Sequence, residues 1–248
     1  MLLFYVRHGD PIYSPDSLTP LGERQAEAIA KRLSLYGIDD IYTSSSNRAI
    51  LTSKPTCEIL KKEATVLDWC NEAYAANDFF FKSKEGIDTW CFYMQDIIEI
   101  FNSKEVKALG ENWAEHPAFA DYNFKSGIER IKRETYAFLE QIGFAYDQEK
   151  GMYKSSKCGN KRIALFAHQG FGLLFLSTVL NIPYPMFCTH FDMTHTGMTV
   201  IEFPECDGYI TPKALTLSND SQSTEKVCQP NIITKYIFNC PTNKNHLL

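Results

Sequence analysis

The residues best suited to chemistry near the start of this sequence are Arg7, His8 and Gly9, which directly follow the apolar residues 2–6. A neutral imidazole is a good nucleophile toward phosphorus, and a neighbouring guanidinium can donate a fork of hydrogen bonds to phosphate oxygens. The glycine would let the backbone approach the phosphate closely. The alternative is a histidine that only satisfies a backbone carbonyl, but the convergence of the three residues favours phosphoryl chemistry on His8.

A second histidine, His168, follows the apolar residues 163–167 and precedes Gln169 and Gly170. Ligands of open α/β sheets bind at the C-terminal ends of the strands, so we expect His8 and His168 at one edge of a sheet. Histidine as a simple cap is the alternative here too.

Arg48 lies at the start of an expected helix, where backbone amides also favour anions. By itself it could equally be a solvated surface arginine. Together with Arg7 it would place two fixed positive charges around one phosphate dianion. The imidazoles of His8 and His168 would also donate hydrogen bonds to the negative charge that develops in the transition state. The candidate substrate-binding residues are Arg7, Gly9, Arg48, His168 and Gln169.

A leaving alkoxide needs a proton, so we expect an acid beside the pocket. Glu72 is the best candidate because it follows the apolar pair 66–67, where we expect another strand to end. Asp68 and Asp78 are the rivals. The candidate catalytic residues are His8, Glu72, Arg7, Arg48 and His168, and no metal ligands are expected.

The elements that would position these residues alternate in type. Thr19 and Pro20 predict a helix start and Gly37 its end. Residues 10–17 are expected to form a loop, residues 38–44 a strand, and residues from about 45 a helix that Pro55 should break or restart. The order β-α-β-α favours a parallel sheet.

Residues 73–157 differ from the rest because they are dense in aromatic side chains, with helical spacing in the stretch 128–142. We expect a mostly helical cap over the sheet edge, whose aromatics form its own core or line the substrate entrance. Beyond it, residues 163–167 predict a strand, 171–180 a helix, 198–203 a strand and 209–217 its return. We therefore expect one domain over residues 1–248, with a three-layer α/β/α fold, a mostly parallel sheet and a helical cap insertion.

Composition excludes several classes of protein. The 248 residues carry a net charge of −5, which argues against a nucleic-acid binder. The eight cysteines show no zinc spacing and are expected to be reduced thiols. No apolar run reaches the roughly 18 residues that span a membrane. Because an apolar strand begins at residue 2, we expect no leader peptide and a cytoplasmic protein. The sequence is also compatible with a homodimer.

These residues resemble the histidine phosphatase superfamily, which includes the phosphoglycerate mutases. The resemblance rests on Arg7-His8-Gly9, the segment from Ser44 to Arg48-Ala49, Glu72 and His168. It extends to residues 19–26, which resemble the helix that follows the Arg-His-Gly motif in this family.

The resemblance implies His8 as the phosphorylated nucleophile, Arg7, Arg48 and His168 as the phosphate pocket, and Glu72 as the proton donor, with no cofactor. We expect a metal-independent, histidine acid phosphatase-type phosphomonoesterase that acts on a small-molecule phosphoester. A phosphoglycerate mutase-type isomerase is one alternative. Residues 10–13 depart from the pattern of many members of the family, and residues 73–76 depart from that of the mutases, which favours hydrolysis over mutase activity. A non-catalytic module that binds a phosphorylated ligand is the other alternative.

Overall fold

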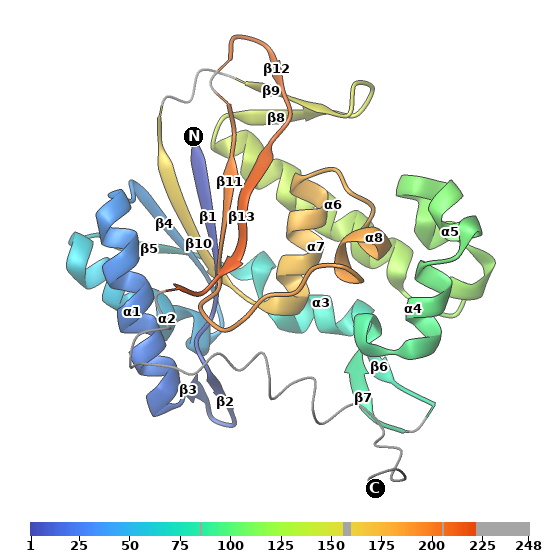
Figure 1. Ribbon diagram of the computed structural model, residues 1–248, viewed down its shortest axis with the longest axis horizontal. Coiled ribbons are helices and arrows are strands. Elements are labelled where there is room, and N and C mark those ends of the chain that lie inside the picture. Colours follow the sequence, from blue (N-terminus) through green and yellow to red (C-terminus); the bar gives the residue numbers. More distant parts are fainter. Residues whose placement is uncertain (85, 156–159, 205, 222–248) are drawn as a thin grey trace, which may run out of the picture.

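The computed structural model describes residues 1–84, 86–155, 160–204 and 206–221 (Figure 1). Its strands are β1 (Leu2–Arg7), β2 (Pro11–Tyr13), β3 (Asp16–Leu18), β4 (Asp40–Ser44), β5 (Ala64–Leu67), β6 (Phe80–Lys82), β7 (Asp88–Trp90), β8 (Phe144–Asp147), β9 (Met152–Ser155), β10 (Arg162–Ala167), β11 (Met198–Glu202), β12 (Tyr209–Ile210) and β13 (Lys213–Asn219). Its α-helices are α1 (Pro20–Tyr36), α2 (Asn47–Leu60), α3 (Glu72–Phe79), α4 (Gln95–Phe101), α5 (Lys104–Leu109), α6 (Phe124–Gln141), α7 (Gln169–Val179) and α8 (Tyr184–Cys188), with short 3-10 turns between them.

The central sheet has the strand order β13-β11-β1-β10-β4-β5. The pairs β1–β10, β10–β4 and β4–β5 are parallel, whereas β11 and β13 add an antiparallel edge. The expected mixed α/β fold with a mostly parallel sheet is therefore confirmed. Because β1 and β10 are parallel neighbours, with Arg7 beside Ala167, the residues that follow both strands emerge together.

Alternating side chains of β1 pack on opposite faces of the sheet and define the three layers. Phe4 and Val6 belong to the core under α1, together with Ile29 and Leu33 of that helix. Leu3 and Tyr5 belong to the larger core on the other face. Figure 1 shows α1 and α2 on one side of the sheet, and α6 and α7 on the other.

The predicted limits of α1 are confirmed. The hydroxyl of Thr19 accepts a hydrogen bond from the Gly22 amide, and Gly37 ends the helix in the left-handed conformation, with φ of 69°. The predicted break at Pro55 is wrong, because α2 runs through it. A proline inside a helix removes one hydrogen bond, but Ser53 and Thr56 on either side are buried, so packing holds α2 in place.

The predicted loop over residues 10–17 is also wrong in part, because β2 and β3 form an antiparallel hairpin there. Two prolines in this segment concealed the strands, since proline is tolerated only at strand edges. Other boundaries differ by a few residues. The expected strand over 38–44 begins at Asp40, and the expected helix over 171–180 begins at Gln169. The return after β11 is β13, whereas β12 pairs with β9.

The aromatic-rich stretch contributes mainly to the core. Within it, Phe101, Trp113, Phe119 and Phe124 are buried and pack edge to face against one another. The helix α6 does not lie over the sheet edge but packs on the sheet, with Phe138 against Tyr42 of β4. The part that extends away from the sheet in Figure 1 is formed by α4, α5 and the β6–β7 hairpin.

The described helices include none that is long and apolar enough to cross a membrane. Five of the eight cysteines lie in the described residues and are free thiols: Cys57, Cys70, Cys91, Cys188 and Cys206. Cys158, Cys228 and Cys240 lie outside the described residues.

Candidate active site

His8 and His168 lie side by side where β1 and β10 end. The amide of His8 donates to the Ala167 carbonyl at 2.9 Å, and the two rings meet edge to face with their centroids 5.2 Å apart. Both side chains are buried. The parallel pairing of the two strands therefore delivers two imidazoles to one point of the sheet edge.

One ring nitrogen of His8 is engaged by the backbone. Nδ1 lies 2.7 Å from the Gly9 carbonyl, which can only accept, so Nδ1 carries the proton and Nε2 has the lone pair. Within the described residues no hydrogen bond engages Nε2. Burial, and then the charge of Arg7, hold the pKa of His8 well below its usual 6.5. The geometry therefore presents a neutral imidazole with a free nucleophilic nitrogen.

His168 is fixed by contacts at both ring nitrogens. Its Nε2 lies 2.8 Å from the Ser44 hydroxyl and 3.2 Å from the Ser46 hydroxyl. Its Nδ1 lies 3.2 Å from Nη2 of Arg48, which can only donate, so Nδ1 must accept and Nε2 must carry the proton. Burial, and then Arg48, lower the pKa of His168 well below 6.5. This imidazole is also held neutral.

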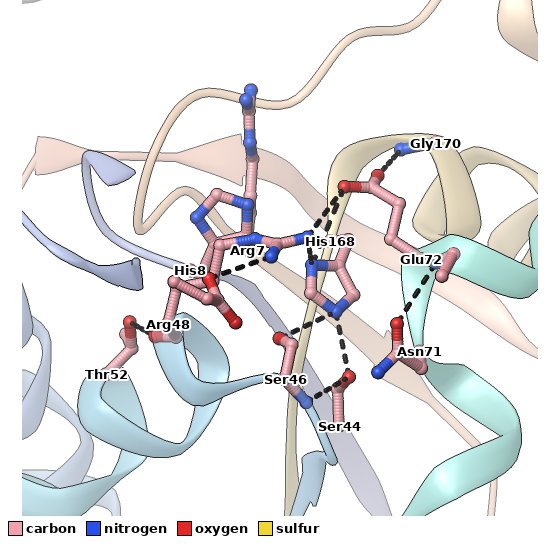
Figure 2. A network of polar contacts seen from close by, with 12 residues as sticks. Arg7, His8, Ser44, Ser46, Arg48, Thr52, Asn71, Glu72, His168 and Gly170 are labelled. Carbon is pink, nitrogen blue, oxygen red and sulfur yellow. Dashed lines mark hydrogen bonds and ion pairs between the residues drawn. The ribbon is translucent and has the colours of Figure 1, made fainter. Parts of the chain in front are cut away.

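Arg48 lies in the first turn of α2 and reaches between Glu72 and His168 (Figure 2). Its Nη2 is 3.3 Å from Glu72 Oε2, and its Nη1 is 2.9 Å from Asp16 Oδ1 in the β2–β3 hairpin. The Tyr13 ring lies 5.6 Å from the guanidinium carbon. The Nε–H of Arg48 is buried, with no acceptor among the described residues.

Arg7 is held from a different part of the chain. Its Nη1 donates to the Met193 carbonyl at 2.5 Å, and its Nη2 lies 3.0 Å from Nε2 of His195. The Nε–H of Arg7 is likewise buried, with no acceptor in the described part of the chain. Each of the two guanidinium groups therefore has one buried N–H without an acceptor among the described residues. A buried donor without an acceptor destabilises the fold unless a bound anion accepts from it.

Glu72 is the acidic residue that the fold brings to the two histidines. Its Oε1 accepts a hydrogen bond from the Gly170 amide at 2.8 Å, and its Oε2 lies 3.6 Å from Nδ1 of His168. Figure 2 shows these contacts converging from α3 and from the residues after β10. Asp68 instead accepts from the hydroxyls of Ser45 and Tyr74, and Asp78 pairs with Arg130.

Gly9 and Gln169, the other two predicted substrate-binding residues, contact neighbouring elements of the fold. The amide of Gly9 donates to the Thr52 hydroxyl at 3.0 Å, and a Cβ atom at Gly9 would lie 2.7 Å from the Gly22 carbonyl oxygen. The lack of a side chain at Gly9 therefore serves close packing against α1. The Gln169 side chain donates to the Tyr93 hydroxyl and to Asp192, which ties α7 to the 3-10 turn after β7 and to the connection between α8 and β11.

Sequence reasoning missed four polar residues of this site. Asp16 and His195 pair with the two arginines, whereas Ser44 and Ser46 hold His168. Ser46 occupies the N-cap position of α2, but its hydroxyl makes no cap hydrogen bond and contacts His168 instead. The signal available for Ser44 was its position at the end of a parallel strand.

A metal ion is a further candidate for this pocket, because His8, Glu72 and His168 offer ligand atoms within 4.8 Å of one another. However, Nη2 of Arg48 lies 3.3 Å from Glu72 Oε2 and 3.2 Å from Nδ1 of His168. A fixed cation between the ligand atoms opposes binding of a second cation. The donor set therefore fits an anion better than a metal ion.

Comparison with known families supports this picture. Residues 3–75 match the model of the histidine phosphatase superfamily (branch 1). The resemblance to this superfamily is confirmed. The matched segment holds Arg7, His8, Arg48 and Glu72 of the site, whereas His168 lies beyond it. No curated protein matches the sequence.

Solved structures of histidine phosphatase-like enzymes share the fold over most of their length. Phosphoserine phosphatase from Entamoeba histolytica, in complex with 3-phosphoglyceric acid, is 16% identical, with a TM-score of 0.56 over 89% of this chain and 98% of that chain. Mycobacterial glucosyl-3-phosphoglycerate phosphatase is 17% identical, with a TM-score of 0.56 over 88% of this chain and 98% of that chain. The alpha-ribazole phosphatase from Shigella flexneri is 16% identical, with a TM-score of 0.55 over 89% of this chain and 97% of that chain. At these identities the likeness establishes the fold, and the neighbours are phosphatases.

Proposed function

We propose that this chain is a phosphomonoester hydrolase that transfers the phosphoryl group to Nε2 of His8. The observation that carries the proposal is the unengaged Nε2 of a neutral, buried imidazole beside two guanidinium groups with unmatched donors. An imidazole in this state is a nucleophile, and the arginines would neutralise the charge on the phosphoryl oxygens. The family match and the phosphatase neighbours are consistent with this reaction class.

The reaction would have two steps. In the first, the lone pair of Nε2 forms a bond to phosphorus, and the bond from phosphorus to the ester oxygen breaks with its electron pair on that oxygen. In the second, water attacks the phosphohistidine, which releases orthophosphate and restores neutral His8. Arg7, Arg48 and His168 would bind the phosphoryl oxygens in both steps.

Glu72 would move the protons of both steps. It would protonate the leaving oxygen in the first and take a proton from the attacking water in the second. Its contacts with Gly170 and Arg48 hold the carboxyl group beside His168, within 4.8 Å of a ring nitrogen of His8. No step in this scheme needs a metal ion or an organic cofactor.

A small-molecule phosphoester is the substrate class that we propose. The Tyr13 ring lies next to Arg48, and the Tyr93 hydroxyl bonds to Gln169 beside His168, so aromatic side chains stand close to the phosphate pocket. Both tyrosines are partly exposed and available to a leaving group. These side chains would contact the alcohol part of the ester.

The test is phosphate release from p-nitrophenyl phosphate in the presence of EDTA. Wild type and His190→Ala, which changes an exposed histidine bonded to the Met186 carbonyl, should turn over alike. His8→Ala should lose turnover. Wild-type protein with no release would contradict the proposal. Interconversion of 2- and 3-phosphoglycerate with a bisphosphoglycerate primer would then indicate a mutase, and phosphoester binding without any turnover would indicate a binding module.

A further inference from the structure

We propose that His195, oriented by Asp10, is a positioning residue for the Arg7 guanidinium and thereby sets the affinity of the pocket for phosphate. The inference rests on the proposed function, because it explains how one side of that pocket is held in place. His195 lies in the connection between α8 and β11, far in sequence from the motif at residues 7–9.

The contacts of His195 define its tautomer. Its Nε2 lies 3.0 Å from Nη2 of Arg7, which can only donate, so Nε2 accepts. The proton of a neutral ring is then on Nδ1, which lies 3.4 Å from Asp10 Oδ1. Asp10 therefore favours the one tautomer whose Nε2 can receive the Arg7 donor.

Asp10 is itself fixed to the rest of the fold. Its Oδ2 accepts from the Thr19 hydroxyl at 2.7 Å, and its backbone amide donates to Oε1 of Gln25 at 2.7 Å. Thr19 caps α1 and Gln25 is buried in that helix. The series Asp10, His195, Arg7 thus links the pocket to the N-terminal turns of α1.

The loop that carries His195 holds Arg7 both at its guanidinium group and at its backbone. The Met193 carbonyl accepts from Nη1 of Arg7 at 2.5 Å, while the Thr196 amide donates to the backbone carbonyl of Arg7 at 3.0 Å. With Nη1 and Nη2 both engaged, the guanidinium plane is fixed and its Nε–H stays the buried donor without an acceptor among the described residues. Loss of the His195 acceptor would free this plane to rotate.

The position next to the nucleophile makes this contact relevant to chemistry. The centroids of the His195 and His8 rings are 5.7 Å apart. The side chains of His195 and Asp10 are only 19% and 27% exposed, so their contacts are less screened than surface pairs. Displacing the Arg7 guanidinium here would misplace the oxygens of a phosphoryl group whose phosphorus is bonded to His8.

Three variants at one position test the proposal. His195→Gln can place an amide oxygen near the position of Nε2, whereas His195→Asn is too short to reach Arg7, and His195→Ala removes both functions. Each is compared with His190→Ala, whose imidazole lies in the same connection and bonds to Thr189 and the Met186 carbonyl. The readouts are the Kd of orthophosphate by calorimetry, kcat/KM for p-nitrophenyl phosphate, and thermal unfolding.

We expect His195→Ala and His195→Asn to weaken orthophosphate binding about ten-fold or more, as for loss of a hydrogen bond to a charged group, and to lower kcat/KM in parallel. His195→Gln should recover most of both losses, and His190→Ala should match wild type. Wild-type behaviour of His195→Ala, or equal losses in the Gln and Ala variants, would overturn the proposal. The second result would mean that His195 does not act by accepting a hydrogen bond from Arg7.

Asp10→Asn provides an independent measurement if His195→Ala does not fold. It should weaken orthophosphate binding in the same direction, and it should add little when combined with His195→Gln, since both act through one contact with Arg7. If the two substitutions weaken orthophosphate binding by fully additive amounts, Asp10 does not act through His195 and the proposal is wrong. Orthophosphate binding can be measured without turnover. If the wild-type chain binds orthophosphate but hydrolyses no substrate, the proposed function is wrong, and the effect of His195 on orthophosphate affinity can still be measured.

Discussion

The backbone amide of Gly170 donates to Oε1 of Glu72 at 2.8 Å, which joins the first turn of α7 to the first turn of α3. The two residues lie 98 positions apart in the chain. Gly170 can approach Trp90 closely because it lacks a side chain, as a Cβ atom there would lie 2.3–2.6 Å from the Trp90 ring. The position of Glu72 therefore depends on tight packing behind it.

Glu72→Gln tests the proposed acid. The amide can still accept from the Gly170 amide but cannot supply a proton, so kcat/KM for an alkyl phosphate, which reports the first step, should fall by about 10²–10⁴-fold. The kcat/KM for p-nitrophenyl phosphate should fall much less, because its leaving group needs no proton. The measurement is kcat/KM for both substrates. Equal losses of kcat/KM on the two substrates would contradict proton donation by Glu72.

Arg48→Lys should lower kcat/KM by about 10- to 100-fold, although the charge is kept. A lysine cannot contact Asp16 and Glu72 at the same time as it binds phosphate, since it lacks the planar fork of donors. Steady-state kinetics of the variant would measure this, and the Kd of orthophosphate should rise in the same proportion. Lys54→Ala, on the exposed side of α2, is the matched control.

Ser44→Ala should lower kcat/KM by about 2- to 10-fold, because it removes an acceptor from Nε2 of His168. With Ser46→Ala added, the ring would lose both hydroxyl partners and its preference for the Nε2–H tautomer. Nitrogen NMR of labelled histidine would report that tautomer directly. Ser53→Ala removes a buried hydroxyl in α2 away from the site and should leave the signals unchanged.

The two buried histidines predict a stability that depends on pH. Burial lowers the pKa of His8 and His168 well below 6.5, so below pH 6.5 the unfolded chain binds protons that the folded chain does not. The free energy of unfolding should thus be fully retained above pH 6.5 and fall by up to about 1.4 kcal/mol per histidine for each pH unit below it. Denaturant unfolding at several pH values measures this slope. His8→Ala should reduce the slope, and an unchanged slope would argue against a neutral His8.

Gly22→Ala should destabilise the fold by about 1–3 kcal/mol, because a Cβ atom there would lie 2.2 Å from the Asp10 carbonyl oxygen. This contact is between backbone segments and cannot relax as a side chain can. Glu27→Ala places the same residue at an exposed position of α1 and should change stability by less than about 0.5 kcal/mol. The denaturation midpoints of Gly22→Ala and Glu27→Ala are compared. The difference separates the effect of the steric clash at Gly22 from the effect of an alanine on helix propensity.

Much of the framework could be read from the sequence because it follows local rules. Apolar runs at β1 and β10 are typical of buried parallel strands, and Thr19 and Gly37 mark the limits of α1 through capping chemistry. The same runs placed Arg7 and His8 at the sheet edge. The position of a residue could be predicted where that residue comes directly after the end of a strand in the sequence.

The remaining site residues depend on long-range geometry that spacing does not encode. Asp16 belongs to a hairpin whose prolines resemble loop residues, and it reaches Arg48 only because β3 packs beside α2. His195 lies in an irregular connection, so no periodicity indicates where its ring lies. Its contact with Arg7 follows from the antiparallel pairing of β11 with β1, which was not part of the β-α-β pattern.

All eleven residues of α7 are buried, so the helix behind His168, to which Gly170 belongs, exposes no face to solvent. Such an element opens only when the whole domain unfolds. The β2–β3 hairpin, by contrast, carries the exposed Tyr13 over Arg48. The two sides of the candidate pocket should therefore differ in local stability, with faster amide exchange in β2 than in α7.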